Sequence, residues 1–172
     1  MFGLFKSKQE KISNALIDKA IAGQSFLYKL FLKNLECDES SIRKLEISYF
    51  VASIITANYL RVGEKDNNEE ILNSFGIGFL QKSLAESGEK ISIGTVVKEY
   101  QARFSEYHGL LWLCFNPDNS TTGNPTLTLL LHVFECVTNS SAVPYMLKLC
   151  EVSGFIQTFV FEHVSFINKL KS

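Results

Sequence analysis

The sequence feature that most constrains the fold is a regular repeat of apolar residues between Ile93 and Leu111. Apolar side chains recur there at the three- and four-residue spacing that lines one face of an α-helix: Ile93, Val96, Val97, Tyr100, Phe104, Tyr107 and Leu111. Similar patterns occupy the rest of the chain, and glycines or polar segments separate them. The sequence therefore predicts an all-α protein, a single irregular bundle of about seven or eight helices.

The segment at about residues 41–62 is predicted to be the central helix of this bundle. It contains the run ISYFVASIITANYLRV, whose apolar residues lie nearly all round the helix and whose polar residues are mostly small. A helix that is apolar on every side is normally buried. The other expected helices are, in chain order, residues 10–22 ending at Gly23, 25–35, 69–86, 92–115, 125–137, a short helix before Gly154, and 155–171.

The chain length and composition fit one domain with one core. The 172 residues are 46% hydrophobic and 20% charged, which is typical of an ordered globular protein. We assign residues 9–172 to a single helical domain and residues 1–8 to an N-terminal arm. The polar segment at residues 116–124 is expected to be an exposed loop, because it holds turn-forming residues.

Charge and cysteine usage argue against several classes of protein. The net charge is -1 and the chain has only three arginines, so we expect no nucleic-acid binding. The four cysteines form no CxxC pair and lie in or beside apolar runs, which indicates reduced thiols in a cytoplasmic protein without a disulfide: Cys37, Cys114, Cys136 and Cys150. No stretch offers ~18 uninterrupted apolar residues, so we expect no transmembrane span.

Two histidines could carry chemistry but have simpler interpretations. His132 and Glu135 are three residues apart on one helix, so they could share a metal ion or a proton. The further ligands that such a site needs are not apparent, and we interpret the pair as part of a solvated helix stripe, with no metal and no cofactor expected. His163 lies within the apolar face of the last helix and is expected to be a buried, neutral residue.

The densest cluster of functional side chains lies between Glu99 and His108. Glu99 and Arg103 are four residues apart, which favours an ion pair along the helix. Arg103 could also pair across to another helix or anchor an anion or a partner. The structural ion pair is the favoured interpretation, because such networks are common outside active sites.

The N-terminal arm begins with apolar residues, Phe2, Leu4 and Phe5, and lysines follow them. Such a segment could insert into an anionic membrane surface. Its apolar patch is short, so we favour docking on the bundle, a second copy or a partner protein over peripheral membrane contact.

No recognised catalytic or ligand-binding motif occurs in the chain. The leading hypothesis is a non-enzymatic cytosolic interaction protein: an adaptor, an inhibitor, an immunity-type protein or a regulatory subunit. One alternative is a helical bundle that binds an apolar small molecule between its helices. A second is an enzyme of unrecognised type that uses Arg103, His108 and carboxylates. The candidate interaction residues are Phe2, Leu4, Phe5, Arg103, Tyr107, His108 and Trp112.

Overall fold

The computed structural model describes residues 7–62, 68–116, 118 and 123–171. This part of the chain contains six α-helices and no strand: α1 (Lys8–Lys29), α2 (Lys44–Val62), α3 (Asn68–Ser87), α4 (Ile93–Phe115), α5 (Pro125–Thr138) and α6 (Met146–Lys171). A π-helical turn, η1 (Leu30–Asn34), continues α1, and short 3₁₀ turns precede α2 (η2, Glu39–Ser41) and α6 (η4, Val143–Tyr145). The all-α class and the single bundle are confirmed.

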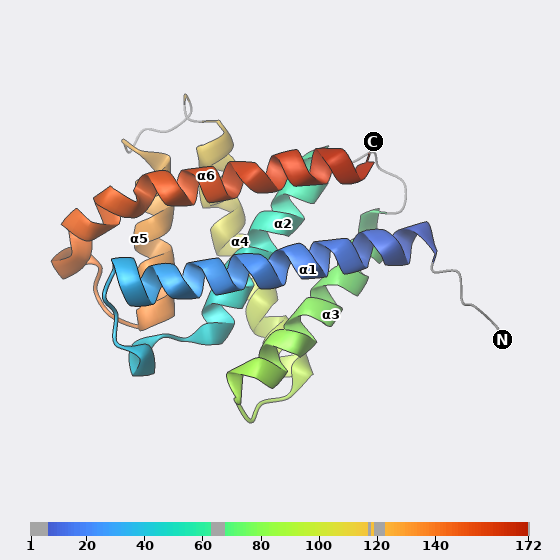
Figure 1. Ribbon diagram of the computed structural model, residues 1–172, viewed down its shortest axis with the longest axis horizontal. Helices are drawn as coiled ribbons and strands as arrows, with labels where there is room; N and C mark the ends of the chain where they lie inside the picture. Colours follow the sequence, from blue (N-terminus) through green and yellow to red (C-terminus); the bar gives the residue numbers. More distant parts are fainter. Residues whose placement is uncertain (1–6, 63–67, 117, 119–122, 172) are drawn as a thin grey trace.

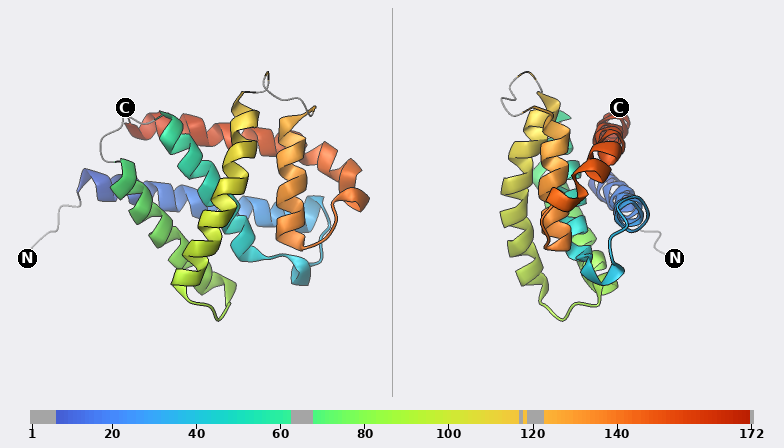
Figure 2. Two further views of the ribbon diagram at one scale, coloured as in Figure 1. Left: turned by 180° about the vertical axis from the view of Figure 1, so that it is seen from behind. Right: turned by 90° about the vertical axis from the view of Figure 1, so that its left-hand side faces the viewer.

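The helices pack in layers around α2 (Figures 1 and 2). In the view of Figure 1, α1 and α6 lie in front and run in opposite directions, while α4 and α5 lie behind them. α2 passes between these layers and contacts each of the other five α-helices. Phe50, Ile54 and Ile55 are fully buried on it, so the predicted central position of this helix is confirmed.

The central helix begins at Lys44, slightly later than expected. Residues Glu39–Ser41 form a separate 3₁₀ turn because the Asp38 side chain accepts a hydrogen bond from the backbone N–H of Ser40, at 3.0 Å. This local bond caps the turn.

The expected number of seven or eight helices is wrong for the described residues, because neither Gly23 nor Gly154 ends a helix. Gly23 lies inside α1 and Gly154 inside α6. A Cβ atom on Gly23 would lie only 2.9 Å from Cζ of Phe159, so this glycine leaves room for the Phe159 ring of α6 against α1. A single glycine costs a helix only about 1 kcal/mol, which tertiary packing can offset.

The predicted starts of α4 and α5 are confirmed by their capping bonds. The Ser92 side chain accepts a hydrogen bond from the N–H of Thr95. The Asn124 side chain accepts hydrogen bonds from the N–H groups of Thr126 and Leu127, and Pro125 follows it as the first helical residue. Local sequence sets these ends, because the cap residues bond within their own first turn.

Two expectations fall mainly outside the described residues. The arm residues Phe2, Leu4 and Phe5 are among residues 1–6, and most of the 116–124 loop is likewise not described. Both the docked arm and the exposed loop stay predictions. Within the described part of the chain, no helix is long and apolar enough to cross a membrane.

His163 is buried, as the apolar face of its helix predicts. Its side chain has no exposed surface, and Nδ1 lies 2.7 Å from the carbonyl oxygen of Phe159, to which it can donate. Burial lowers the pKa of His163 to about 4, the hydrogen bond to Phe159 opposes this shift, and the positive charge of Lys19 adds to it. The imidazole is therefore neutral near pH 7.

This lowered pKa predicts a loss of stability in mild acid. The unfolded chain takes up the proton first, near the ordinary histidine pKa of about 6.5, so the stabilising effect is complete above that pH. It is lost as the pH falls toward 4, the folded value. We expect the wild-type protein to lose about 2 kcal/mol more than His163→Phe between pH 7 and pH 5. Urea unfolding at both pH values measures this difference, and equal losses in the two proteins would contradict it.

Candidate functional site

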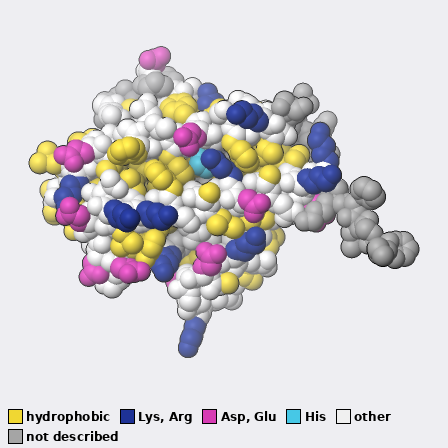
Figure 3. Space-filling model, in the orientation of Figure 1, with side chains coloured by type: hydrophobic (Ala, Val, Ile, Leu, Met, Phe, Trp, Pro, Cys, Tyr) yellow, Lys and Arg dark blue, Asp and Glu magenta, His cyan; other side chains and the backbone are white. Residues whose placement is uncertain are grey.

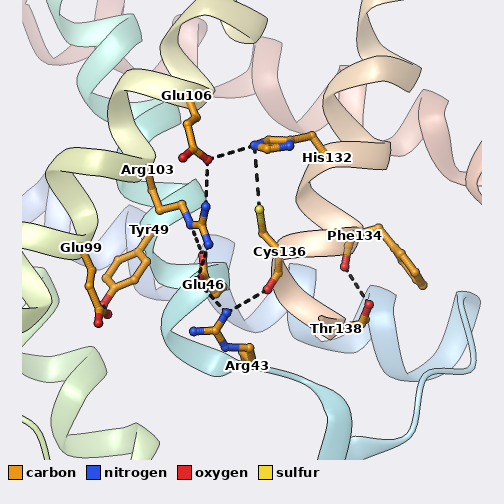
Figure 4. A network of polar contacts seen from close by, with 10 residues as sticks. All are labelled: Arg43, Glu46, Tyr49, Glu99, Arg103, Glu106, His132, Phe134, Cys136 and Thr138. Carbon is orange, nitrogen blue, oxygen red and sulfur yellow. Dashed lines mark hydrogen bonds and ion pairs between the residues drawn. The ribbon is translucent and has the colours of Figure 1, made fainter. Parts of the chain in front are cut away.

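A network of charged side chains joins α2, α4 and α5 (Figure 4). Its centre is the Glu46 carboxylate, whose side chain is only 4% exposed. Arg103 of α4 donates to both Glu46 oxygens, from Nε at 3.0 Å and from Nη2 at 3.2 Å. Arg43 approaches the same carboxylate at 3.0 Å. Two guanidinium groups therefore compensate one buried negative charge.

The expected ion pair between Glu99 and Arg103 is not the one that forms. Arg103 pairs across to α2, as the alternative interpretation of this residue proposed, and Glu99 instead accepts a hydrogen bond from the Tyr49 hydroxyl at 2.8 Å. The reason is burial: Glu46 is almost entirely buried and so depends on the guanidinium more than the exposed Glu99 does.

The network continues from Arg103 to α5. Nη1 of Arg103 donates to Oε2 of Glu106 at 2.9 Å, and the same oxygen lies 3.2 Å from Nε2 of His132. Nε2 of His132 lies 3.8 Å from Sγ of Cys136, one helical turn further along α5. Glu106, His132 and Cys136 together form what we call the Glu–His–Cys cluster, whose three possible ligand atoms lie within 4.8 Å of one another.

The surroundings of this cluster shift its pKa values. Partial burial tends to raise the pKa of Glu106, but the hydrogen bonds and charges of Arg103 and His132 outweigh burial and lower it. Burial raises the pKa of the Cys136 thiol, and the nearby Tyr107 hydroxyl and Arg103 charge partly oppose that rise. Cys136 is therefore a thiol near neutral pH, not a ready nucleophile.

His132 does not share its site with Glu135. The carboxylate of Glu135 accepts a hydrogen bond from the backbone N–H of Ala142 at 3.2 Å, which secures the turn after α5. Glu106 takes the expected place of Glu135, and it comes from a different helix. Sequence spacing could reveal the pairing of His132 with Cys136 but not the contribution of α4.

A second feature is a surface hollow where the C-terminal ends of α2 and α4 meet, which we call the α2–α4 hollow. Its volume is about 400 Å³, and its lining residues are Ala57, Leu60, Arg61, His108, Trp112, Phe115 and Asn116. Leu60 and Trp112 are each 48% exposed. The Arg61 guanidinium lies over the Phe115 ring, 4.6 Å from its centre. The hollow therefore presents a positive charge directly beside an aromatic surface.

The structure separates the candidate interaction residues into two groups. His108 and Trp112 line the α2–α4 hollow and are exposed. Tyr107 is fully buried between Phe50 and His132, and Arg103 is held by Glu46 and Glu106. Leu60 and Arg61 were not predicted to belong to this site, since nothing in the sequence of α4 indicates which end of α2 it meets.

Arg103 and His108 do not converge on one site. Five residues separate them, which places them about 140° apart around the α4 axis. Arg103 faces the Glu–His–Cys cluster, whereas His108 faces the α2–α4 hollow. The two side chains named for the enzyme hypothesis therefore belong to different features.

A smaller apolar groove lies between α1 and α6. Phe26, Phe155 and Phe159 contribute to it, with a volume of about 310 Å³. Figure 3 shows hydrophobic side chains along α6 and this seam, with basic and acidic side chains around them. Phe26 stacks on Phe159 with ring centres 5.3 Å apart, so part of this apolar surface is already paired within the chain.

Searches with this chain find no matching protein-family model, no similar curated protein and no similar solved structure. The function of the chain is therefore inferred from the geometry of its own residues.

Proposed function

We propose that this chain acts by contact with another protein, as an adaptor, an inhibitor, an immunity-type protein or a regulatory subunit. The α2–α4 hollow is the proposed contact surface. The observation that carries the proposal is the exposure of Trp112 and Leu60, 48% each, which line a hollow together with Arg61 and His108. Exposed apolar clusters with a polar rim are typical of protein interaction sites.

The residue types support a protein partner. Tryptophan and arginine are enriched among the residues that dominate binding energy, especially around a depression that a partner side chain can fill. Covering the exposed part of Trp112 would add about 1–2 kcal/mol of apolar burial, while Arg61 and His108 would hydrogen-bond at the edge. We propose a partner that inserts an apolar side chain into the hollow.

A photo-crosslinking amino acid placed at position 112 should capture this partner in cells that produce the protein. The matched control position is 147, because Leu147 is 81% exposed on α6, away from the hollow. Once the captured protein is identified and purified, Leu60→Asp should weaken its binding about thirtyfold, the effect of one interaction hot spot. Leu147→Asp should leave the affinity unchanged.

The proposal fails if position 112 captures no protein beyond those captured at position 147. It also fails if Leu60→Asp binds the captured protein as tightly as the wild type does. Melting temperatures of both aspartate variants must match the wild type, which is expected because both side chains are exposed.

In the alternative function, an apolar small molecule would bind in the α2–α4 hollow. Its volume of about 400 Å³ lies within the range of ligand pockets. Native mass spectrometry of the freshly purified wild-type protein would then show the added mass of a bound small molecule. The Trp112→Ala variant should lack this added mass. We further propose a cytosolic location, which the four free cysteines support.

A further inference from the structure

We propose that Glu106, His132 and Cys136 bind a divalent transition-metal ion, with Zn²⁺ the best match to their chemistry. One carboxylate, one imidazole and one thiol converge from two helices, within 4.8 Å of one another. Mixed nitrogen, sulfur and oxygen ligands are typical of Zn²⁺, whereas Mg²⁺ and Ca²⁺ prefer oxygen alone.

The distances already approach those of a bound ion. Bond lengths of about 2.0–2.3 Å in a tetrahedral site place neighbouring ligand atoms about 3.3–3.7 Å apart. Glu106 Oε2 lies 3.2 Å from His132 Nε2, and Cys136 Sγ lies 3.8 Å from the same nitrogen. Small side-chain rotations would therefore suffice to enclose an ion. The partial exposure of Glu106 and His132, 43% and 34%, leaves the fourth position open to water.

Rigid elements hold each ligand. His132 and Cys136 are four residues apart on α5, so one helix face presents both. Glu106 is oriented by Arg103, which is itself fixed by both oxygens of Glu46. The Glu46 carboxylate, which Arg103 shares with Arg43, offsets part of the positive charge of Arg103 and so reduces its repulsion of a cation.

A buried hydroxyl provides an independent observation. The Tyr107 hydroxyl is fully buried and makes no well-formed hydrogen bond. Buried polar groups without partners are rare in folded proteins. This hydroxyl lies beside the Cys136 thiol. When Cys136 is a thiolate, its sulfur can accept a hydrogen bond from the Tyr107 hydroxyl, which would satisfy the hydroxyl and stabilise the metal ligand.

Metal binding would release a proton from Cys136 and change the proton position on His132. The Cys136 thiol releases one proton to water, and its sulfur electron pair forms the bond to the metal. Nε2 of His132 gives up to water the proton that it now donates to Glu106, and Nδ1 takes up a proton from water, so the ring binds the ion as the neutral imidazole. The ion then takes the place of the hydrogen bond between Nε2 and Glu106. No oxidation or reduction takes place.

Titration of the purified full-length protein with Co²⁺, which replaces Zn²⁺ and absorbs light, tests the site. We expect intense visible bands of a tetrahedral ion and a near-ultraviolet band from sulfur-to-cobalt charge transfer, with Zn²⁺ displacing both. Cys136→Ser should abolish the charge-transfer band. Cys150→Ser, which changes the exposed cysteine of α6, should keep it. Tyr107→Phe, which retains all three ligands, should weaken Zn²⁺ binding about 10–100-fold.

X-ray absorption of the wild-type Zn²⁺ protein keeps the test independent of variant folding. One sulfur neighbour at about 2.3 Å, with lighter atoms beside it, is expected. The absence of a sulfur neighbour, or a cobalt charge-transfer band that survives Cys136→Ser, would overturn the proposal. So would the absence of any cobalt spectrum at a hundredfold excess of metal.

Discussion

Replacing Ile54 or Ile55 with alanine should lower the free energy of unfolding by about 2–5 kcal/mol. Both side chains are fully buried on α2, which contacts the other five α-helices. Removing three carbon atoms there loses apolar burial and leaves a cavity that the surrounding helices can fill only in part.

Urea unfolding followed by far-ultraviolet circular dichroism measures this loss. Leu60→Ala is the matched control, since it removes an aliphatic side chain from the same helix at a position that is 48% exposed. Its effect should stay below about 1 kcal/mol. Losses of less than about 1 kcal/mol for both isoleucine variants would show that α2 does not form the core.

Replacing Arg103 with methionine should destabilise the fold by about 3 kcal/mol. The variant keeps a long apolar side chain but removes two of the hydrogen bonds to Glu46, a carboxylate that is only 4% exposed. A buried charge that loses its partner is costly. The loss lies at the lower end of the usual range because Arg43 still pairs with Glu46 at 3.0 Å.

Two further variants identify the cause of that loss. Arg43→Met should cost less than Arg103→Met, because the Arg43 side chain is 49% exposed and provides one contact to Glu46. Adding Glu46→Gln to Arg103→Met should recover about 1 kcal/mol, since the buried negative charge, left with Arg43 as its partner, is then absent. A double variant less stable than Arg103→Met alone would contradict this explanation.

Features set by neighbouring residues could be predicted from the sequence. The starts of α4 and α5 follow from Ser92 and Asn124, whose side chains bond within the first helical turn. The burial of His163 follows from the apolar face around it. The helix end predicted at Gly23 was wrong because the role of this glycine depends on Phe159, which lies far along the chain on α6. Helix periodicity does not show which distant side chain a glycine will meet.

The candidate sites show the same limit. His108 and Trp112 share a face of α4 at four-residue spacing, and both line the α2–α4 hollow. Leu60 and Arg61 complete that hollow from another helix. Similarly, the spacing of His132 and Cys136 is local, but Glu106 joins them only because α4 packs beside α5. The relative placement of helices depends on side-chain packing across the whole core.

The contact of α2 with all five other helices has a thermodynamic consequence for any ligand. Since the other five helices all pack against α2, the loss of any one of them would expose core surface on the rest. We therefore expect the domain to unfold as one unit. A molecule that binds only the folded state then stabilises the whole domain by RT ln(1 + [L]/Kd), wherever its site lies. A metal ion between α4 and α5 and a partner at the α2–α4 hollow would therefore raise one shared melting temperature.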